Sequence, residues 1–342
     1  MLYKKIIIDQ IREEVNGFKT FSFKQGHNIQ YKAGQYLTLV HQTNHEEIRR
    51  SYSIVSSPLL NEPLTIGVKR IENGVLSRHL VDRSEIGDEL LTTGAAGFFT
   101  LPEDIETYKQ VFFFAAGSGI TPIFSLLKTV LHFHKNIHAV LIYSNSSKER
   151  TIFFKQLQKL AIELPGQFRL HFIFSDVPDL HAAHLNRDYL LKLLSKYSIA
   201  DFSRSWFYLC GPETYMRMCT YTLQEEKVPK QNIRRETFLV HTRPHQSLPP
   251  DQATHSVKIY FENNAYEFDV HYPDSILQAA RKNAINLPYS CETGRCGNCA
   301  AKCIQGNIWL SYNEVLTEKD LQNGSTLTCV GHPVNADVIL KI

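Results

Sequence analysis

Four cysteines near the C-terminus have the spacing of an iron–sulfur site. Cys291, Cys296 and Cys299 form a C-x4-C-x2-C loop, and Cys329 follows after a long gap. Two irons bridged by two sulfides need four thiolates, and this arrangement is the one expected for a [2Fe–2S] cluster. Two glycines inside the loop allow the tight backbone turns that such a cluster requires. A structural zinc site is the alternative, but zinc sites usually combine two short CxxC clips. The sequence therefore predicts a [2Fe–2S] cluster on these four thiols.

A glycine-containing turn further upstream has the composition of a phosphate-binding loop. The apolar run VFFFAAG leads into Gly117, Ser118, Gly119 and Thr121, and a helical pattern follows. Glycines let the backbone approach a pyrophosphate, and the free N–H groups and dipole of a helix N-terminus favour its charge. An ordinary tight turn between a strand and a helix would carry the same string. Its position after the first strand of an alternating segment favours a dinucleotide site.

These candidate sites lie in a chain whose composition is that of a globular protein. The 342 residues are 43% hydrophobic and carry a net charge of +3, with Lys and Arg scattered rather than gathered into runs. This pattern gives no indication of a nucleic-acid partner. The N-terminus does not read as a signal peptide and the other cysteines show no pairing pattern, so we expect a cytoplasmic protein. Glycines and a proline interrupt the apolar stretch at 111–127, which favours a buried strand and helix over a membrane span.

The order of strand and helix patterns divides the chain into three domains. Short strand-like runs separated by turn residues fill residues 1–102, which predicts an antiparallel β-barrel. Apolar strands alternate with helical segments over 103–240, as in a doubly wound parallel α/β sheet. Three prolines without apolar periodicity mark 241–254 as a linker. A strand pair, an amphipathic helix and the cysteine loop make 255–342 the size of one small α+β domain.

The string RSYS at positions 50–53 makes the first domain recognisable. On a strand, Arg50 and Tyr52 would share one face, where a guanidinium can bind a phosphate and a ring can stack on an aromatic cofactor. The string resembles the RxYS motif of the ferredoxin–NADP reductase-like flavoproteins. That resemblance implies that Arg50 binds the flavin phosphate, Tyr52 stacks on the isoalloxazine, and Ser53 forms a hydrogen bond near flavin N5. A half-buried strand without a ligand would also fit these residues taken alone.

Two more segments match the flavin-binding half of this family in the same order. Residues 66–80 resemble its second flavin segment, in which a strand, a turn and a helix N-terminus hold the pyrophosphate. The resemblance implies flavin contacts at Val68, Lys69, Gly74, Val75, Leu76 and Ser77. The string GAAGFF at 94–99 resembles the short loop that closes the barrel before the nucleotide domain.

The nicotinamide side of the family is matched near the end of the second domain. The string YLCGPETYMR resembles the family's last central strand and the turn beside the nicotinamide, which implies contacts at Cys210, Gly211, Pro212 and Glu213. Cys210 would also suit the role of a small buried hydrophobe. Glu236 and Phe238 resemble the segment that approaches the flavin at the end of the reductase module. The resemblance thus implies catalytic roles for Ser53, Cys210 and Glu236.

Together the matches span the whole chain. They imply a flavin and nicotinamide reductase over roughly the first 240 residues, fused to a β-grasp ferredoxin domain. Electrons would pass from NAD(P)H through the flavin to the [2Fe–2S] cluster and on to a partner protein. The layout and the string GSGITP most resemble the reductase components of phenylacetyl-CoA epoxidase and similar oxygenase systems, which implies an oxygenase partner. Reduction of another acceptor and a redox-sensing role stay open.

The resemblance favours FAD over FMN, although some reductases of this layout use FMN. The choice between NADPH and NADH depends on the loop after the second nucleotide-domain strand, where acidic residues bind ribose hydroxyls and basic ones a 2′-phosphate. Ser146 and Arg150 in this loop favour NADPH. Glu149 does not fit that pattern, and a solvated loop that touches no nucleotide explains it equally well. NADPH or NADH therefore remains the expected donor.

Overall fold

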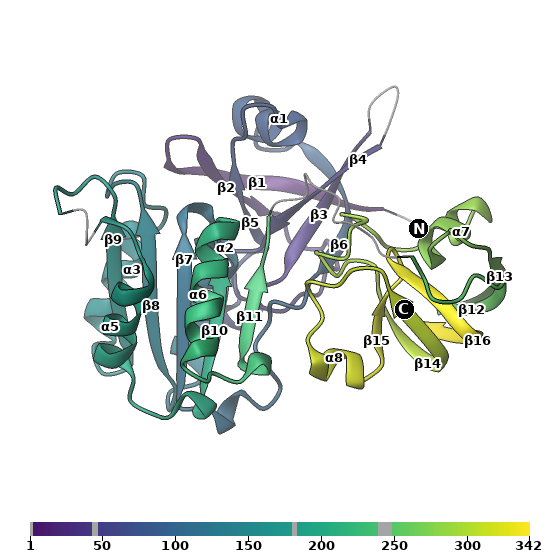
Figure 1. Cartoon of the computed structure of the whole chain (residues 1–342). Coiled ribbons are helices and arrows are strands. Elements are labelled where there is room, and N and C mark those ends of the chain that lie inside the picture. Colours follow the sequence, from purple (N-terminus) through teal and green to yellow (C-terminus); the bar gives the residue numbers. More distant parts are fainter. Residues whose placement is uncertain (1–2, 43–46, 180–182, 239–247) are drawn as a thin grey trace. The chain divides into compact units, whose positions relative to one another are not determined.

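The computed structural model describes residues 3–42, 47–179, 183–238 and 248–342 (Figure 1). Contacts within the chain separate two units, Tyr3–Thr237 and Phe238–Ile342. The first contains a barrel and a parallel sheet, and the second contains the four cluster cysteines. None of the described helices is long and apolar enough to cross a membrane.

The barrel is a six-stranded antiparallel sheet in the order β4-β3-β6-β1-β2-β5. Its elements are β1 (Lys4–Val15), β2 (Phe18–Phe23), β3 (Tyr36–Gln42), β4 (Glu47–Ser53), η1 (Pro58–Leu60), β5 (Thr65–Lys69), α1 (Val75–Arg83) and β6 (Glu89–Ala96). A bridge between Ile54 and Ile66 joins the two edges, so the sheet closes on itself. Apolar side chains from the strands and α1 fill the interior. The predicted antiparallel barrel is confirmed.

Two local features of the barrel differ from the sequence expectation. The run RSYSIVS looks like one strand, but β4 ends at Ser53. Ile54 forms a bridge to Ile66, and the Val55 N–H donates to the Thr65 carbonyl, so the chain turns towards β5. The string GAAGFF looks like a loop, but its first three residues end β6 and pair with β3. Small residues there hide the alternation by which strands are recognised.

The nucleotide half is a parallel sheet, as predicted, and its five strands lie in the order β11-β10-β7-β8-β9. Its main elements are β7 (Gln110–Ala116), η3 (Gly117–Gly119), α2 (Ile120–Phe133), β8 (His138–Asn145), α3 (Phe154–Glu163), β9 (Phe168–Phe174), α5 (Arg187–Tyr197), β10 (Ser205–Cys210), α6 (Glu213–Glu225) and β11 (Ile233–Glu236). Short 3-10 turns lie at Ile105–Thr107 (η2), Phe202–Arg204 (η4) and Lys230–Asn232 (η5).

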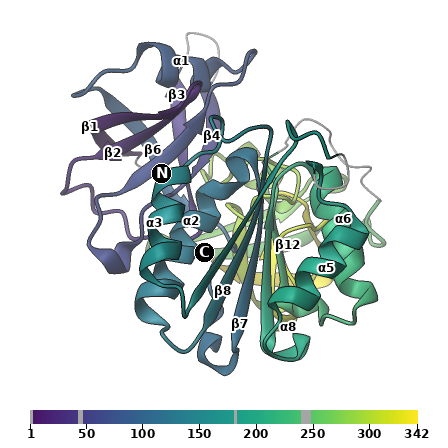
Figure 2. The same cartoon turned by 90° about the vertical axis from the view of Figure 1, so that its left-hand side faces the viewer.

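Helices cover both faces of this sheet, with α2 and α3 on one side and α5 and α6 on the other (Figure 2). Along β7, Val111 and Phe113 pack in the α2 core, whereas Phe112 and Phe114 pack in the α5 and α6 core. Burial on both faces explains why the strand is a continuous apolar run. The sheet order places β7 at the centre, so its loop and the end of β10 meet at one edge.

The second unit is a five-stranded mixed sheet in the order β13-β12-β16-β14-β15. Its elements are β12 (His255–Phe261), β13 (Asn264–Val270), α7 (Ile276–Lys282), β14 (Ala300–Leu310), α8 (Glu318–Gln322), β15 (Ser325–Leu327) and β16 (Gly331–Lys341). The strands β12 and β16 run parallel, and the other pairs are antiparallel. Ser275 and Gln278 form a capping box that begins α7. The predicted strand pair and helix are both present.

The predicted linker, 241–254, lies partly outside the described residues, which resume at 248. Its last residues are fixed to the second unit. The Asp251 carboxylate accepts hydrogen bonds from the backbone N–H groups of Asn335 (2.7 Å) and Ala253 (2.8 Å). It also lies 2.7 Å from the His255 ring nitrogen. Residues from Asp251 onward therefore belong structurally to the cysteine-containing unit, while the exact domain boundaries stay predictions.

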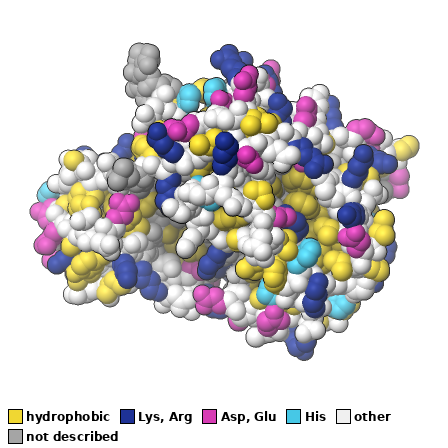
Figure 3. All heavy atoms as spheres, turned by 180° about the vertical axis from the view of Figure 1, so that it is seen from behind, with side chains coloured by type: hydrophobic (Ala, Val, Ile, Leu, Met, Phe, Trp, Pro, Cys, Tyr) yellow, Lys and Arg dark blue, Asp and Glu magenta, His cyan; other side chains and the backbone are white. Residues whose placement is uncertain are grey.

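Charged side chains are mixed over the face shown in Figure 3. Lys and Arg alternate there with Asp and Glu among neutral and apolar groups. This view matches the scattered charges of the sequence.

Candidate functional site

Strand β4 presents the first predicted flavin residues at the end of the barrel sheet. Arg50 is exposed and Tyr52 is half-buried against the barrel core, where burial raises the pKa of its hydroxyl. Ser53 is only 4% exposed, and its hydroxyl has no hydrogen-bond partner among the described residues. A buried hydroxyl without a partner is unfavourable by about 1–3 kcal/mol. A bound ligand that supplies a hydrogen bond at Ser53 would remove that penalty.

The second flavin segment forms the expected strand, turn and helix. Gly74 is the N-cap of α1, and the Ser77 hydroxyl accepts from the N–H of Ile71 (3.2 Å) and donates to the Gly74 carbonyl (3.3 Å). A Cβ on Gly74 would lie 2.3 Å from that hydroxyl, so a side chain there would require Ser77 to move. The first N–H groups of α1 have no partner within the helix and can receive a phosphate.

The other predicted residues of this segment differ in what they can offer. The side chains of Val68 and Leu76 are buried in the barrel core, so only their backbone could contact a flavin. Lys69 and Val75 are exposed, Val75 by 57%. The turn therefore offers backbone groups and one cation to a ligand.

The glycine turn after β7 leads directly into α2, as the sequence predicts. Gly117 has a φ of 53°, and the buried Tyr143 donates a hydrogen bond to its carbonyl (2.9 Å). The Thr121 hydroxyl donates to the Ser118 carbonyl (2.8 Å) and ties the turn to the helix. A Cβ on Gly119 would lie 2.0 Å from the Cys210 carbonyl oxygen, so the turn touches the end of β10.

Cys210 and Glu236 lie side by side at the carboxyl edge of the parallel sheet. They are paired in register as the last residues of β10 and β11. Cys210 is fully buried, and burial raises the pKa of its thiol well above the usual range. Burial also raises the pKa of Glu236 to about 8. The Cys210 thiol is therefore protonated at pH 7 and is not a thiolate nucleophile, and burial favours the neutral form of Glu236.

The turn that follows Cys210 begins helix α6. Gly211 approaches β7 so closely that a Cβ would lie 2.9 Å from the Cβ of Ala116. Pro212 is the N-cap of α6 and Glu213 is its first residue. These three residues therefore lie at the same sheet edge as the Gly117 turn.

The positions of the residues predicted to bind the nucleotide ribose, and of Phe238, give less support to their predicted roles. Ser146 and Arg150 follow β8 in an exposed loop, where Lys148 lies over the Phe154 ring at 5.1 Å. Phe238 is 44% exposed and belongs to the second unit, so its flavin contact stays a prediction.

The four predicted cluster thiols interact as two pairs. Hydrogen bonding between the Cys291 and Cys296 thiols lowers the pKa of Cys291 and raises that of Cys296. Cys329 donates to Cys299, and its own pKa is raised. Two thiolates for each of two irons are the ligand set of a [2Fe–2S] cluster.

The backbone around these thiols is shaped for a cluster. The N–H groups of Thr293 and Asn298 point at Cys291 (3.4 Å) and Cys296 (3.5 Å). Gly294 has a φ of 74°, and a Cβ there would lie 2.7 Å from the Tyr312 carbonyl oxygen. The buried side-chain amide of Asn298 has no partner among the described residues. These donors fit the sulfur atoms of a cluster held by the four cysteines.

Some supporting residues carry no recognisable sequence pattern. Arg295 and Glu314 form an ion pair of 3.0 Å at the edge of the cysteine loop, and Arg295 lies over the Tyr312 ring at 5.6 Å. Tyr143 supports the glycine turn from the neighbouring strand. Their partners are distant in sequence, so only the fold reveals them.

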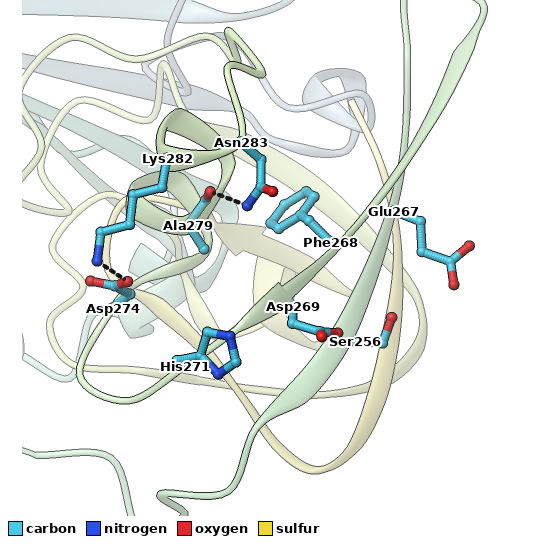
Figure 4. A pocket seen from close by; sticks show the side chains of 9 residues that line it. All are labelled: Ser256, Glu267, Phe268, Asp269, His271, Asp274, Ala279, Lys282 and Asn283. Carbon is cyan, nitrogen blue, oxygen red and sulfur yellow. Dashed lines mark hydrogen bonds and ion pairs between the residues drawn. The ribbon is translucent and has the colours of Figure 1, made fainter.

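A polar pocket of about 550 Å³ lies between β12, β13 and α7 (Figure 4). Lys282 and Asp274 form an ion pair of 2.5 Å at one side. Asp269 of β13 and His271, which follows that strand, also line the pocket. It contains none of the predicted site residues.

Comparison with known families accounts for all three domains. The oxidoreductase FAD-binding domain family matches residues 6–101, and the oxidoreductase NAD-binding domain family matches 113–220. The 2Fe-2S iron-sulfur cluster binding domain family matches 259–334, which includes all four paired cysteines. The chain is a reductase that combines an FAD-binding, an NAD-binding and a [2Fe–2S] cluster-binding domain. FAD, a pyridine nucleotide and the [2Fe–2S] cluster are the cofactors of this reductase.

Curated relatives of the reductase align over nearly the whole chain. It is 28% identical to a component of 1,2-phenylacetyl-CoA epoxidase from Escherichia coli, covering 99% of this chain and 97% of that protein. It is 25% identical to the reductase component of glycine betaine monooxygenase from Chromohalobacter salexigens, covering 95% and 91%. The solved structure of phthalate dioxygenase reductase shares the fold with a TM-score of 0.61 and 22% identity, covering 99% and 98%.

The geometry assigns a part of the electron path to each domain of the reductase. A bound FAD would supply the chemistry that accepts a hydride from NAD(P)H and releases single electrons to the [2Fe–2S] cluster. The chain itself has to hold these groups in position and exclude water. The two helix N-termini suit the phosphates, the edge at Cys210 and Glu236 suits the nicotinamide ring, and the four cysteines would hold the irons.

Proposed function

We propose that this reductase delivers its electrons to the oxygenase or epoxidase component of a system that acts on aromatic acyl-CoA compounds of the phenylacetyl-CoA type. The observation that carries the proposal is the alignment over 99% of the chain with a component of 1,2-phenylacetyl-CoA epoxidase. The reductase component of a monooxygenase aligns over 95% of the chain as well. Because these relatives belong to different systems, the partner's substrate has to be tested directly.

We propose the following roles at the flavin and nicotinamide sites. Arg50 binds the flavin phosphate, Tyr52 stacks on the ring system, and Ser53 forms a hydrogen bond at the reactive N5 edge. The buried, unpartnered hydroxyl of Ser53 among the described residues supports this assignment. Cys210 and Glu236 line the nicotinamide position, which their shared place at the sheet edge supports.

We propose NADPH as the preferred donor. Ser146 and Arg150 lie in the loop at the carboxyl end of β8, where a doubly wound sheet binds the adenosine ribose. Arg150 is exposed and could reach a 2′-phosphate. The rates of flavin bleaching at equal concentrations of NADPH and NADH decide between the two donors.

The electron path is tested by adding NAD(P)H to the purified protein without oxygen. We expect the flavin bands to bleach first and the cluster absorbance to follow. Cys299→Ser should abolish the cluster absorbance while NAD(P)H still bleaches the flavin, because the flavin residues lie in the other unit. Cys303→Ser is the matched control, since Cys303 lies outside the four-cysteine set and its thiol donates to the Gln305 carbonyl. Loss of flavin reduction in Cys299→Ser alone would contradict the path.

The partner is tested with candidate oxygenase components. We expect the reduced protein to transfer electrons to an oxygenase that acts on phenylacetyl-CoA faster than to unrelated acceptors. A pull-down under reducing conditions identifies the physiological component. Equal, slow transfer to every acceptor would contradict the proposed role and favour redox sensing.

A further inference from the structure

Buried hydroxyl groups join the segment after the flavin motif to the helix that begins at the nucleotide turn. The Ser125 hydroxyl of α2 donates to the Ser56 carbonyl oxygen (2.6 Å). The Ser57 hydroxyl pairs with that of Thr129 (2.8 Å). Thr129 donates in turn to the Ser125 carbonyl (2.9 Å), so Ser57 is the donor in the pair. All four side chains are at most 3% exposed. We call these four residues the hydroxyl seam.

An ion pair continues the seam along the same helix. Lys128 lies 2.5 Å from Glu62, and the same Glu62 oxygen accepts from the backbone N–H of Ser57 (2.7 Å). The positions 125, 128 and 129 share one face of α2. That face is therefore bound at three points to residues 56–62 of the barrel.

The hydroxyl seam fixes the geometry of this contact more closely than burial of the helix face alone would require. Apolar side chains would bury this face at least as favourably, because hydrogen bonds between buried hydroxyls contribute only about 1 kcal/mol net. Hydrogen bonds are directional, however, and they fix the translation and rotation of α2 relative to the barrel. The space is also full, since a Cβ on Gly67 would lie 2.7 Å from Thr121 in the first turn of α2.

The hydroxyl seam is close in sequence to the predicted flavin segment and to the nucleotide turn. Ser56 follows Ser53 by three residues, and Ser125 lies one helical turn after Thr121 of the nucleotide turn. A shift of the seam would therefore move the flavin edge relative to the nicotinamide loop. Hydride transfer needs the reacting atoms about 3–3.5 Å apart, and a misplacement of about 1 Å can slow a reaction by about a hundredfold.

We infer that Ser57, Ser125 and Thr129 are positioning residues that set the distance between flavin and nicotinamide for hydride transfer. The inference rests on the proposed placement of Ser53 at the flavin N5 edge. The residues touch neither cofactor in this role. They act by holding α2 in one register against the barrel.

The test is Thr129→Val, which keeps the shape of the side chain and removes its hydroxyl. We expect the rate of flavin bleaching by saturating NAD(P)H to fall about tenfold or more. FAD content and the nucleotide Kd should change less than about twofold, because both cofactor cradles remain intact. The charge-transfer absorbance between nucleotide and flavin should weaken, which a purely structural role would not produce. Thr129→Ser should restore both the rate and the absorbance.

Ser22→Ala is the control, because Ser22 of β2 forms a partly buried hydroxyl pair with Thr65 of β5 (2.8 Å) away from α2. We expect it to keep the bleaching rate. A wild-type rate in Thr129→Val, or equal losses in both variants, would overturn the inference. If Thr129→Val does not fold, the same measurements are made on Ser125→Ala, for which we expect the same result. Absence of any bleaching in the wild-type protein would instead refute the proposed function.

Discussion

Ser53 can be tested as a single hydroxyl at the flavin edge. We expect Ser53→Ala to bind FAD but to be reduced by NAD(P)H about fivefold more slowly, because one hydrogen bond contributes about 1 kcal/mol. Stopped-flow bleaching of the flavin measures the rate. Ser51→Ala is the matched control, since Ser51 lies on the same strand and pairs with Thr38 at 3.0 Å instead. A rate in Ser53→Ala no lower than that in Ser51→Ala would show that the side chain has no part in the reaction.

Site residues could be predicted from the sequence where they are close together in the chain. The spacing of Cys291, Cys296 and Cys299 indicates a cluster because one loop must supply three ligands. Ser57 and Thr129 lie 72 residues apart, and neither has a distinctive neighbour. Their pairing depends on how α2 packs on the barrel, which no local pattern encodes. Tyr143 was missed for the same reason.

Strand and helix ends were predicted where the chemistry of the turn is local. Glycines and a following helical pattern identified the turn after β7. The end of β4 at Ser53 was missed, because it depends on Ile54 changing its partner from β3 to β5. The full parallel sheet order also could not be read, since it is set by long-range pairing.

The close contact between the nucleotide turn and the end of β10 can be tested at Gly119. We expect Gly119→Ala to separate them, because its Cβ would lie 2.0 Å from the Cys210 carbonyl oxygen. Overpacking of this kind is unfavourable by about 1–3 kcal/mol. The nucleotide Kd should rise and the melting temperature fall, while FAD content stays unchanged. Titration with a nicotinamide nucleotide and thermal unfolding measure both effects.

Gly166 offers a matched control for that substitution. It lies in an exposed turn, and a Cβ there would meet no atom within 4 Å. We expect Gly166→Ala to change stability by less than about 0.5 kcal/mol. Equal nucleotide affinities in the two variants would refute the role of close contact at Gly119.

The Asp251 carboxylate binds the first residues of the second unit to its sheet. The stability of this unit should therefore decrease at low pH. Backbone N–H groups of Asn335 and Ala253, with His255, lower its pKa to about 2. In the unfolded chain the pKa is about 4. The stabilisation is therefore complete above about pH 4 and is lost as the pH falls towards 2.

The matching variant is Asp251→Asn. We expect it to lower the melting temperature at pH 7 and to differ less from the wild type as the solution is acidified. Glu267→Gln, at an exposed position on β13, should show no such pH-dependent difference. A constant difference between Asp251→Asn and the wild type from pH 7 to pH 3 would contradict this role of the carboxylate.

At the scale of the whole molecule, the chain between β11 and Asp251 connects the two units. We propose that this segment is a tether that lets the cluster domain move between flavin and partner. The described structure resumes at 248, and Asp251 is already fixed to the cluster unit. The predicted linker, 241–254, has fourteen residues, and a flexible coil of that length would span about 20 Å.

Shortening this tether should separate the two halves of the electron path. We expect deletion of residues 241–246 to leave flavin bleaching by NAD(P)H unchanged, because the flavin and nucleotide residues lie within one unit. Reduction of the partner should slow several-fold, since a short tether restricts the positions that the cluster domain can reach. Replacing the same residues by Gly and Ser at equal length is the control, and it should keep partner reduction. Stopped-flow traces at flavin and partner wavelengths measure the two steps separately. If the deletion reduces the partner as fast as the control does, the domain acts from a fixed position and the tether has no role in delivery.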